Sequence, residues 1–358
     1  MEAKRKQHLA LIALFLSFFV AARGRAGDDD YHNHAKLFVF GDSYADTGNN
    51  ARVLSESWRT PYGHSWPHKP DGRWSDGFVL TDYIAKYLGL RTPVAFRSWK
   101  NHGPKKLKYG MNFAYGGTGV FDTDAPYPNM TMQINFFEQL VKKGVYNSQD
   151  LENSAAFVSV VGNDFAYYIS QHGVDPSDII NYAVVVIAQL AHNVKRVHKI
   201  GVKQVLVTGL PPIGCLPRSI ENNTCNSQYN VLSGDIYNDL WNTTVNQMNV
   251  NESQIRATDY TPYIYLDLYN PLYNIVTGIT SPPSGKPLDN PMEACCTGMT
   301  DDYYCASVAT NGTKMYTLCE NPETKLFWDR SHPSHRGWSE VIYLLRDTFS
   351  QLQIPHKK

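Results

Sequence analysis

The chain has no excess of charge, because 33 basic residues balance 33 acidic residues among its 358 positions. Proteins that bind nucleic acid or an anionic membrane surface usually carry a basic patch or run, so we expect neither partner. A long apolar run is also missing: residues 9–22 form an apolar stretch of 14 residues, and a membrane-spanning helix needs about 20. We expect no stable membrane association. The hydrophobic content of 42% is enough for a buried core, which excludes a disordered chain.

Cysteine is absent from the first half of the chain, and neither a Cys-x-x-Cys nor a His-Glu-x-x-His spacing occurs anywhere. These spacings are typical of zinc sites, so a metal site is disfavoured. Four early histidines lack any such spacing: His32, His34, His64 and His68. We therefore expect no metal ion and no cofactor.

The cysteines present are six, an even number, which favours disulfides in an exported protein. They are Cys215, Cys225, Cys295, Cys296, Cys305 and Cys319. A bond between the first two would close a small loop, and the last four would staple an irregular segment. The sequence leaves the pairing open.

The first 26 residues are typical of a signal peptide. Lys4, Arg5 and Lys6 precede the short apolar stretch, and Gly24-Arg25-Ala26 offers a cleavage site. An uncleaved Golgi anchor is the alternative. We predict that residues 27–358 form a single domain, secreted or retained in the Golgi lumen, and that the protein is a monomer.

Five Asn-x-Ser/Thr acceptors for N-glycosylation agree with export. They lie at Asn129, Asn222, Asn242, Asn251 and Asn311.

Short apolar runs alternate with helical patterns along the chain. Four runs resemble buried strands that end in glycine-containing loops, at residues 37–40, 111–114, 155–161 and 204–208. Helical spacing of apolar residues occurs at residues 178–200, 228–248 and 335–352. This alternation predicts an α/β fold with a parallel sheet covered on both faces. Ligands bind beyond the carboxyl ends of such strands, where we expect several glycine loops to converge.

Two short motifs near opposite ends of the chain supply the parts for serine-based acyl transfer. Ser43 lies in Gly-Asp-Ser, directly after the first strand, and Asp329 precedes His332 by three residues. A serine hydroxyl needs a base to take its proton, and a carboxylate can hold that histidine in the correct tautomer. Position 45 is Ala, so the Gly-x-Ser-x-Gly elbow of α/β-hydrolases is absent.

The oxyanion of the tetrahedral intermediate also needs hydrogen-bond donors. The candidates are the backbone N–H groups of Ser43 and Gly117 and the side-chain amide of Asn163. Gly116 and Gly119 lie in the same loop, and either glycine is an alternative to Gly117.

Four segments in this order resemble the conserved blocks of the GDSL/SGNH esterases. They are residues 41–50, 112–119, 161–164 and 329–333. The resemblance covers most of the chain and implies a three-layer α/β/α sandwich with a central, mainly parallel sheet. It also implies that Ser43 is the nucleophile, His332 the base and then the acid, and Asp329 its orienting partner, with Ser43, Gly117 and Asn163 as the oxyanion hole.

Further features resemble the plant branch of this family, including the leader and the segments at residues 72–77 and 211–215. Tyr44 departs from the usual Leu, and we expect it to pack behind the nucleophile and affect specificity. Trp74 replaces a more usual Phe, which we interpret as a core-like exchange.

The resemblance implies a carboxylic ester hydrolase of the secretory pathway. Our leading hypothesis is an acetyl esterase that removes O-acetyl groups from a xylan-like polysaccharide of the plant cell wall, in the apoplast or the Golgi lumen. The alternatives are a lipid esterase or lipase involved in lipid degradation, an acyltransferase with the same triad, and an inactive carbohydrate-binding protein.

Aromatic residues are abundant near the catalytic segments. They include Trp58, Tyr62, Trp66, Trp74, Tyr115 and Tyr127. Such side chains either pack loops together or form a platform for sugar rings, since aromatic faces serve both uses.

Overall fold

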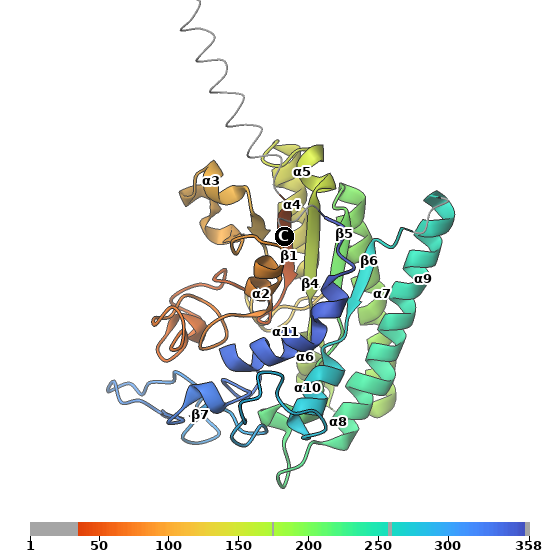
Figure 1. Ribbon diagram of the computed structural model, residues 1–358. Coiled ribbons are helices and arrows are strands. Elements are labelled where there is room, and N and C mark those ends of the chain that lie inside the picture. The colour runs from red at the N-terminus through yellow and green to blue at the C-terminus, as the bar shows by residue number, and fades with distance from the viewer. Residues whose placement is uncertain (1–34, 174, 257–259, 355–358) are drawn as a thin grey trace, which may run out of the picture.

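The computed structural model describes residues 35–173, 175–256 and 260–354 (Figure 1). The predicted signal peptide at residues 1–26 lies outside the described residues. The centre of the fold is a six-stranded sheet in the order β2-β3-β1-β4-β5-β6, and all neighbouring strands are parallel. In chain order the strands are β1 (Lys36–Gly41), β2 (Val94–Ala95), β3 (Gly110–Asn112), β4 (Ser154–Ser159), β5 (Gln204–Thr208) and β6 (Tyr263–Leu266).

Helices cover both faces of this sheet (Figure 1). One face packs on α4 (Met130–Lys142), α7 (Pro176–Ile200) and α9 (Asp239–Arg256). The other face packs on α2 (Leu80–Tyr87), α10 (Tyr269–Val276) and α11 (His335–Phe349). The predicted three-layer α/β/α architecture is therefore confirmed.

The strands read as continuous apolar runs because both of their faces are buried. In β1, Phe38 and Phe40 enter the core under α4, whereas Leu37 and Val39 enter the core under α11. Successive side chains of a strand point to opposite faces, so a single short run contributes to both cores.

Two of the three predicted helices agree with the structure. The helix predicted at residues 178–200 is α7, which Asp175 caps through its side chain and Gly201 terminates at a φ of 128°. The helix predicted at residues 335–352 is α11.

The helix predicted at residues 228–248 is a composite of three pieces. It begins as α8 (Ser227–Val231), widens into the π-helix η5 (Leu232–Asn238) and continues as α9. In the wider part, the side chain of Asn238 bonds both backbone groups of Leu210, at 2.7 and 2.9 Å. Apolar periodicity alone does not reveal this tertiary contact.

The remaining described elements are short. They are α3 (Pro104–Leu107), α5 (Ser148–Glu152), α6 (Asn163–His172), η1 (Glu56–Trp58), η2 (Phe96–Asn101), η3 (Ile213–Cys215), η4 (Pro217–Ser219), η6 (Pro322–Thr324) and the antiparallel pair β7 (Cys296–Gly298) and β8 (Tyr316–Leu318).

All six cysteines form disulfides, as the sequence predicts. The pairs are Cys215–Cys225, Cys295–Cys319 and Cys296–Cys305. The last two staple the segment around β7 and β8, which lies at one end of the molecule (Figure 1). No helix within the described ranges is both long enough and apolar enough to cross a membrane.

Candidate active site

Ser43 lies on a tight turn at the carboxyl end of β1. Gly41 precedes it with a φ of 127°, and a Cβ at this position would overlap the carbonyl oxygen of Ser159, so only glycine fits. The N–H of Asp46 donates to the carbonyl oxygen of Asp42 at 2.9 Å and closes the turn. The turn is therefore fixed against the neighbouring strand β4.

The carboxylate of Asp42 lies beneath this turn. It accepts hydrogen bonds from the backbone N–H groups of Val161, at 2.7 Å, and Tyr44, at 3.2 Å. Burial raises the pKa of Asp42 to about 7, although these two N–H groups act in the opposite direction. Asp42 thus joins the ends of β1 and β4.

His332 lies on a short loop that its own backbone closes. The N–H of Trp328 donates to the carbonyl oxygen of His332 at 2.8 Å. Inside the loop, Oδ1 of Asp329 accepts from the N–H groups of Ser331, at 2.8 Å, and His332, at 2.9 Å. The Asp-x-x-His spacing therefore forms a turn that the aspartate itself organises.

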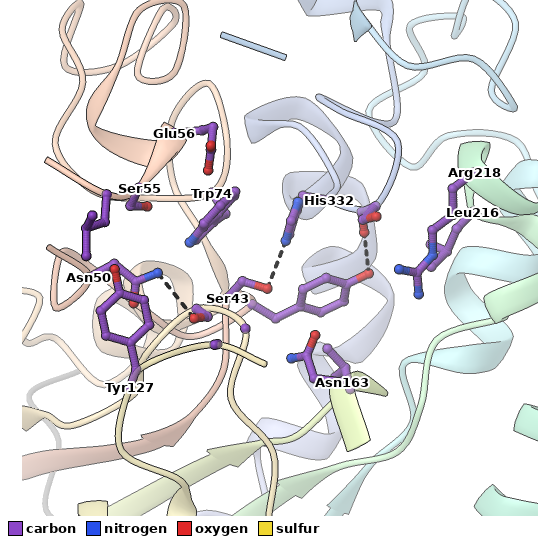
Figure 2. Close-up of a pocket in the computed structure, with 17 residues that line it drawn as sticks. Ser43, Asn50, Ser55, Glu56, Trp74, Tyr127, Asn163, Leu216, Arg218 and His332 are labelled. Carbon is purple, nitrogen blue, oxygen red and sulfur yellow. Dashed lines mark hydrogen bonds between the residues drawn. The ribbon is translucent and has the colours of Figure 1, made fainter. Parts of the chain in front are cut away.

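The structure brings Ser43, His332 and Asp329 together. Figure 2 shows the side chains of Ser43 and His332 pointing toward each other. Nε2 of His332 lies 2.8 Å from Oγ of Ser43. Nδ1 of the same ring lies 2.8 Å from both carboxylate oxygens of Asp329. A carboxylate only accepts hydrogen bonds, so Nδ1 carries the proton and Nε2 is the acceptor for the serine hydroxyl.

Asp329 is buried, and burial by itself would raise its pKa. The neighbouring imidazole of His332 and the Ser331 N–H outweigh that effect and hold the pKa of Asp329 below its usual value. The hydroxyl of Tyr62 contributes in the same direction, donating to Oδ2 at 2.8 Å. This tyrosine is a site residue that sequence reasoning missed, since no local pattern links it to Asp329.

Three potential oxyanion donors surround Ser43. Among the described residues, the backbone N–H groups of Ser43 and Gly117 make no hydrogen bond to the protein, and both residues line the same cavity. The N–H of Gly116 is already bonded to Asp46 at 3.2 Å. Gly119 lies away from the cavity, against the carboxylate of Asp164. Gly117 is therefore the glycine of this loop with a backbone donor available to a ligand.

The amide of Asn163 also lines the cavity, but its nitrogen has partners within the protein. It donates to the carbonyl oxygen of Thr118 at 3.0 Å and lies 3.3 Å from Oδ2 of Asp42. An amide carries two N–H groups, so one can remain on Thr118 while the other turns to a ligand.

A cavity of about 270 Å³ opens above Ser43. Figure 2 shows Asn50, Ser55, Glu56 and Tyr127 on one side of Ser43, and Leu216 and Arg218 on the other. Glu56 and Tyr127 supply the polar groups of the first wall, whereas Asn50 and Ser55 are buried and already bonded to the carbonyl oxygen of Gly116 and to Ser57. Leu216 and Arg218 form the opposite wall.

Arg218 also lines a second hollow of about 240 Å³. Its side chains are mainly apolar and include Phe165, Ile169, Ile213 and Leu232. A third hollow of about 260 Å³ shares Leu232 and continues toward α7. We call the second and third hollows the apolar trough; the trough shares Arg218 with the cavity above Ser43.

The six aromatic residues have different places. Trp74 and Tyr127 line the cavity, whereas Tyr62 is buried and Tyr115 stacks against Tyr127 at a ring distance of 5.8 Å. Trp58 and Trp66 do not line the cavity. Both uses considered from the sequence therefore remain, with loop packing accounting for most of these side chains.

Tyr44 and Trp74 both contact His332. The hydroxyl of the buried Tyr44 donates to the carbonyl oxygen of Ser331 at 2.9 Å, and its ring meets the imidazole edge-on at 5.8 Å. Trp74 stacks on the imidazole at 5.2 Å and 27°. Trp74 packs against the buried cluster around Trp328, as a core-like exchange implies, and its ring also lies on His332 at the wall of the cavity.

The five glycosylation acceptors differ in accessibility. Four are exposed: Asn222, Asn242, Asn251 and Asn311. Asn129 is half-buried and caps α4, with its amide nitrogen 2.7 Å from Asp122 and its oxygen bonded to the Met132 N–H. Glycosylation at these positions stays a prediction.

Comparison with known proteins supports the resemblance inferred from the motifs. Residues 37–345 match the family model of GDSL-like lipases and acylhydrolases. A GDSL esterase/lipase of Arabidopsis thaliana is 39% identical over 360 residues, covering 95% of this chain and 98% of the relative. A second one from the same plant is 40% identical over 353 residues, covering 94% and 96%.

Among solved structures, phospholipase A1 from Streptomyces albidoflavus NA297 matches with a TM-score of 0.40 and 14% identity, covering 88% of this chain and 98% of that chain. A match this distant adds nothing to the family assignment, which depends on the sequence matches. The chain belongs to the family of GDSL-like lipases and acylhydrolases, and it is an ester hydrolase.

Proposed function

We propose that the protein is a serine esterase of the secretory pathway that releases acetyl groups from a cell-wall polysaccharide. Ser43 is the nucleophile, His332 the general base and acid, and Asp329 the group that orients the imidazole. The observation that supports these roles is one continuous chain of contacts, from Oγ through Nε2 and Nδ1 to the carboxylate, with each distance at 2.8 Å.

In the acylation step, Oγ of Ser43 attacks the ester carbonyl carbon while Nε2 of His332 takes the hydroxyl proton. The resulting imidazolium is stabilised by Asp329 and returns this proton to the departing alcohol. Water then enters, gives its proton to the same nitrogen and attacks the acyl-enzyme. Acetate leaves and Ser43 regains its proton.

The oxyanion of both intermediates is bound by the N–H groups of Ser43 and Gly117 and by the amide of Asn163. The two backbone donors are free of protein acceptors within the described part of the chain. Asn163 contributes the N–H that donates to Oδ2 of Asp42 at 3.3 Å in the structure, exchanging this acceptor for the oxyanion while the other N–H stays on Thr118. Loss of one such donor typically lowers the rate by about 10²–10³.

A hydroxyl-rich alcohol fits the polar wall of the cavity. Glu56 and Tyr127 present a carboxylate and a phenol near Ser43, and these groups match sugar hydroxyls. Disulfides and exposed glycosylation sequons are compatible with a protein that acts in the apoplast or the Golgi lumen. We propose a xylan-like polysaccharide as the substrate class and a monomeric enzyme.

A fluorophosphonate that reacts with activated serines tests the nucleophile. It should label the wild type and Ser170→Ala, which changes an exposed serine on α6, but not Ser43→Ala. Equal labelling of Ser43→Ala would refute the assignment. Absence of labelling in all three proteins would instead favour an inactive binding protein.

The apolar trough favours a second candidate, a lipid acyl esterase. Its side chains could accommodate an acyl chain that passes Arg218 from Ser43. Incubation with acetylated xylan and with a long-chain acylglycerol separates the two candidates through the acid released. Acetate without fatty acid supports the first, fatty acid without acetate supports the second, and a new ester in place of free acid identifies an acyltransferase.

A further inference from the structure

Asp329 has a hydrogen-bond donor that the usual three-residue description of such a site omits. The hydroxyl of Tyr62 donates to Oδ2 of Asp329 at 2.8 Å, across 267 residues of sequence. Tyr62 is only 3% exposed and Asp329 only 7% exposed, so water does not replace this contact easily. A hydrogen bond to a buried carboxylate stabilises its charge more than the same hydrogen bond does in water.

The two oxygens of Asp329 differ in how they are held. Oδ1 accepts from the backbone N–H groups of Ser331 and His332 as well as from the imidazole. Oδ2 accepts from the imidazole and, within the described residues, from one other donor only, the hydroxyl of Tyr62. This hydroxyl is therefore positioned to determine how much negative charge Oδ2 directs at His332.

Neighbouring groups hold the ring of Tyr62 in the position from which its hydroxyl reaches Asp329. It packs edge-on against Trp74 at 5.7 Å and against Trp328 at 6.2 Å, and its backbone N–H donates to the carbonyl oxygen of Arg59 at 3.1 Å. Burial and the charge of Asp329 raise the pKa of Tyr62 well above its usual value. The phenol therefore stays protonated and remains a donor.

We propose that Tyr62 is a positioning residue of this esterase that limits how strongly Asp329 attracts the proton of His332. The inference rests on the proposed triad. With the hydroxyl present, the imidazole is free to accept the proton of Ser43 at lower pH. Without it, the carboxylate holds the imidazolium more tightly, and the active form appears only at higher pH.

Other titratable groups surround this pair but do not donate to Oδ2. They are Tyr44 beside the imidazole, Glu56 near Tyr62, His64 against Trp328, Arg218, which lines the cavity with His332, and Arg330, which faces Asp301. Because Tyr62→Phe leaves all of them in place, a change in pH dependence reports on the hydroxyl.

The test is the pH profile of kcat/KM for p-nitrophenyl acetate in the wild type and in Tyr62→Phe. We expect the acid limb of the profile to move upward by about one pH unit, since a hydrogen bond to a charged group is being removed. At pH values below the acid limb, kcat/KM of Tyr62→Phe should be about tenfold lower than that of the wild type. At alkaline pH, where the profile is flat, it should return toward the wild-type value. An unmoved limb overturns the proposal.

Tyr316→Phe is the matched control. Tyr316 lies in the same buried cluster as Tyr62. Its hydroxyl donates to the carbonyl oxygen of Thr60 at 3.2 Å and not to Asp329. The control should leave the limb where it is. If both variants lose activity equally at every pH, the hydroxyl of Tyr62 has only a structural role and the proposal fails.

A variant that preserves the size of the ring guards against misfolding. Site-specific incorporation of 3,5-difluorotyrosine at position 62 makes the phenol a stronger donor, so the limb should move downward, opposite to Tyr62→Phe. Movement in the same direction overturns the proposal.

A double variant separates a failure of the role assigned to Tyr62 from a failure of the proposed triad. In an Asp329→Asn background, Tyr62→Phe should cause no further shift, because the effect acts through the carboxylate. An equal shift in that background contradicts the role assigned to Tyr62, whereas labelling of Ser43→Ala by the fluorophosphonate contradicts the triad itself.

Discussion

Gly119→Ala tests how the loop that contains Gly117 is held in place. A Cβ at position 119 would lie well inside the 3.0 Å that real Cβ atoms keep from the carboxyl group of Asp164. That carboxyl group accepts from the backbone N–H groups of Val120 and Phe121, both at 3.0 Å. Asp164 is buried, so it cannot move aside without leaving both N–H groups without an acceptor.

The magnitude follows from those two contacts. Each buried N–H left unsatisfied costs about 1–3 kcal/mol, so the substitution should lower the free energy of unfolding by about 2–6 kcal/mol. For a chain of this size that corresponds to a fall in the melting midpoint of about 3–9 °C. The remaining folded enzyme should lose about 10²-fold in kcat, because displacement of the loop moves the N–H of Gly117.

Gly103→Ala is the control for thermal unfolding and for kcat on p-nitrophenyl acetate. A Cβ at Gly103 meets nothing within 4 Å, so this variant should stay within about 0.5 kcal/mol of the wild type. Equal melting midpoints for Gly119→Ala and Gly103→Ala would refute the reasoning. A destabilised Gly119→Ala with unchanged kcat would refute the link to the oxyanion donor.

Two further predictions concern stability. The pKa of Asp42 is raised to about 7 in the folded protein, so its contribution to stability is complete below the unfolded pKa of about 4 and is lost as the pH rises through 7. Asp42→Asn should therefore flatten the pH dependence of urea unfolding in that window, and an unchanged slope would exclude this role. Replacing Cys296 and Cys305 by serine should lower the free energy of unfolding by about 2–4 kcal/mol. It should also lower kcat, because the Cys296 N–H donates to the carbonyl oxygen of Trp328, next to Asp329, at 2.7 Å. Full activity of this variant would show that the disulfide does not support the loop that contains Asp329 and His332.

The candidate site could be read from the sequence where its residues follow strands or form their own turns. Ser43 directly follows β1, and the spacing of Asp329 and His332 is the spacing of the turn that they build. The three-layer fold could be predicted for a similar reason, since buried parallel strands are continuous apolar runs. In both cases the information is local.

The rest depends on contacts that no local pattern encodes. Gln133 looks like an ordinary residue of a helix, yet its buried amide bonds both backbone groups of Gly41, at 2.8 and 3.0 Å, and so supports the turn of Ser43. Tyr62 looks like one more aromatic residue in a loop. The strands β2 and β6 were not predicted, because neither short segment leads into a glycine-containing loop like those that follow the predicted strands.

The contact between Ser43 and His332 spans 289 residues, and those of Tyr44 and Tyr62 with the same loop span 287 and 267. The proposed base and its partners are thus the last parts of the site to be synthesised. A nascent chain that has not reached Trp328 contains the proposed nucleophile, Ser43, but lacks the proposed base, His332. On the proposed mechanism, ester hydrolysis therefore cannot begin until the segment that contains Asp329 and His332 has been synthesised.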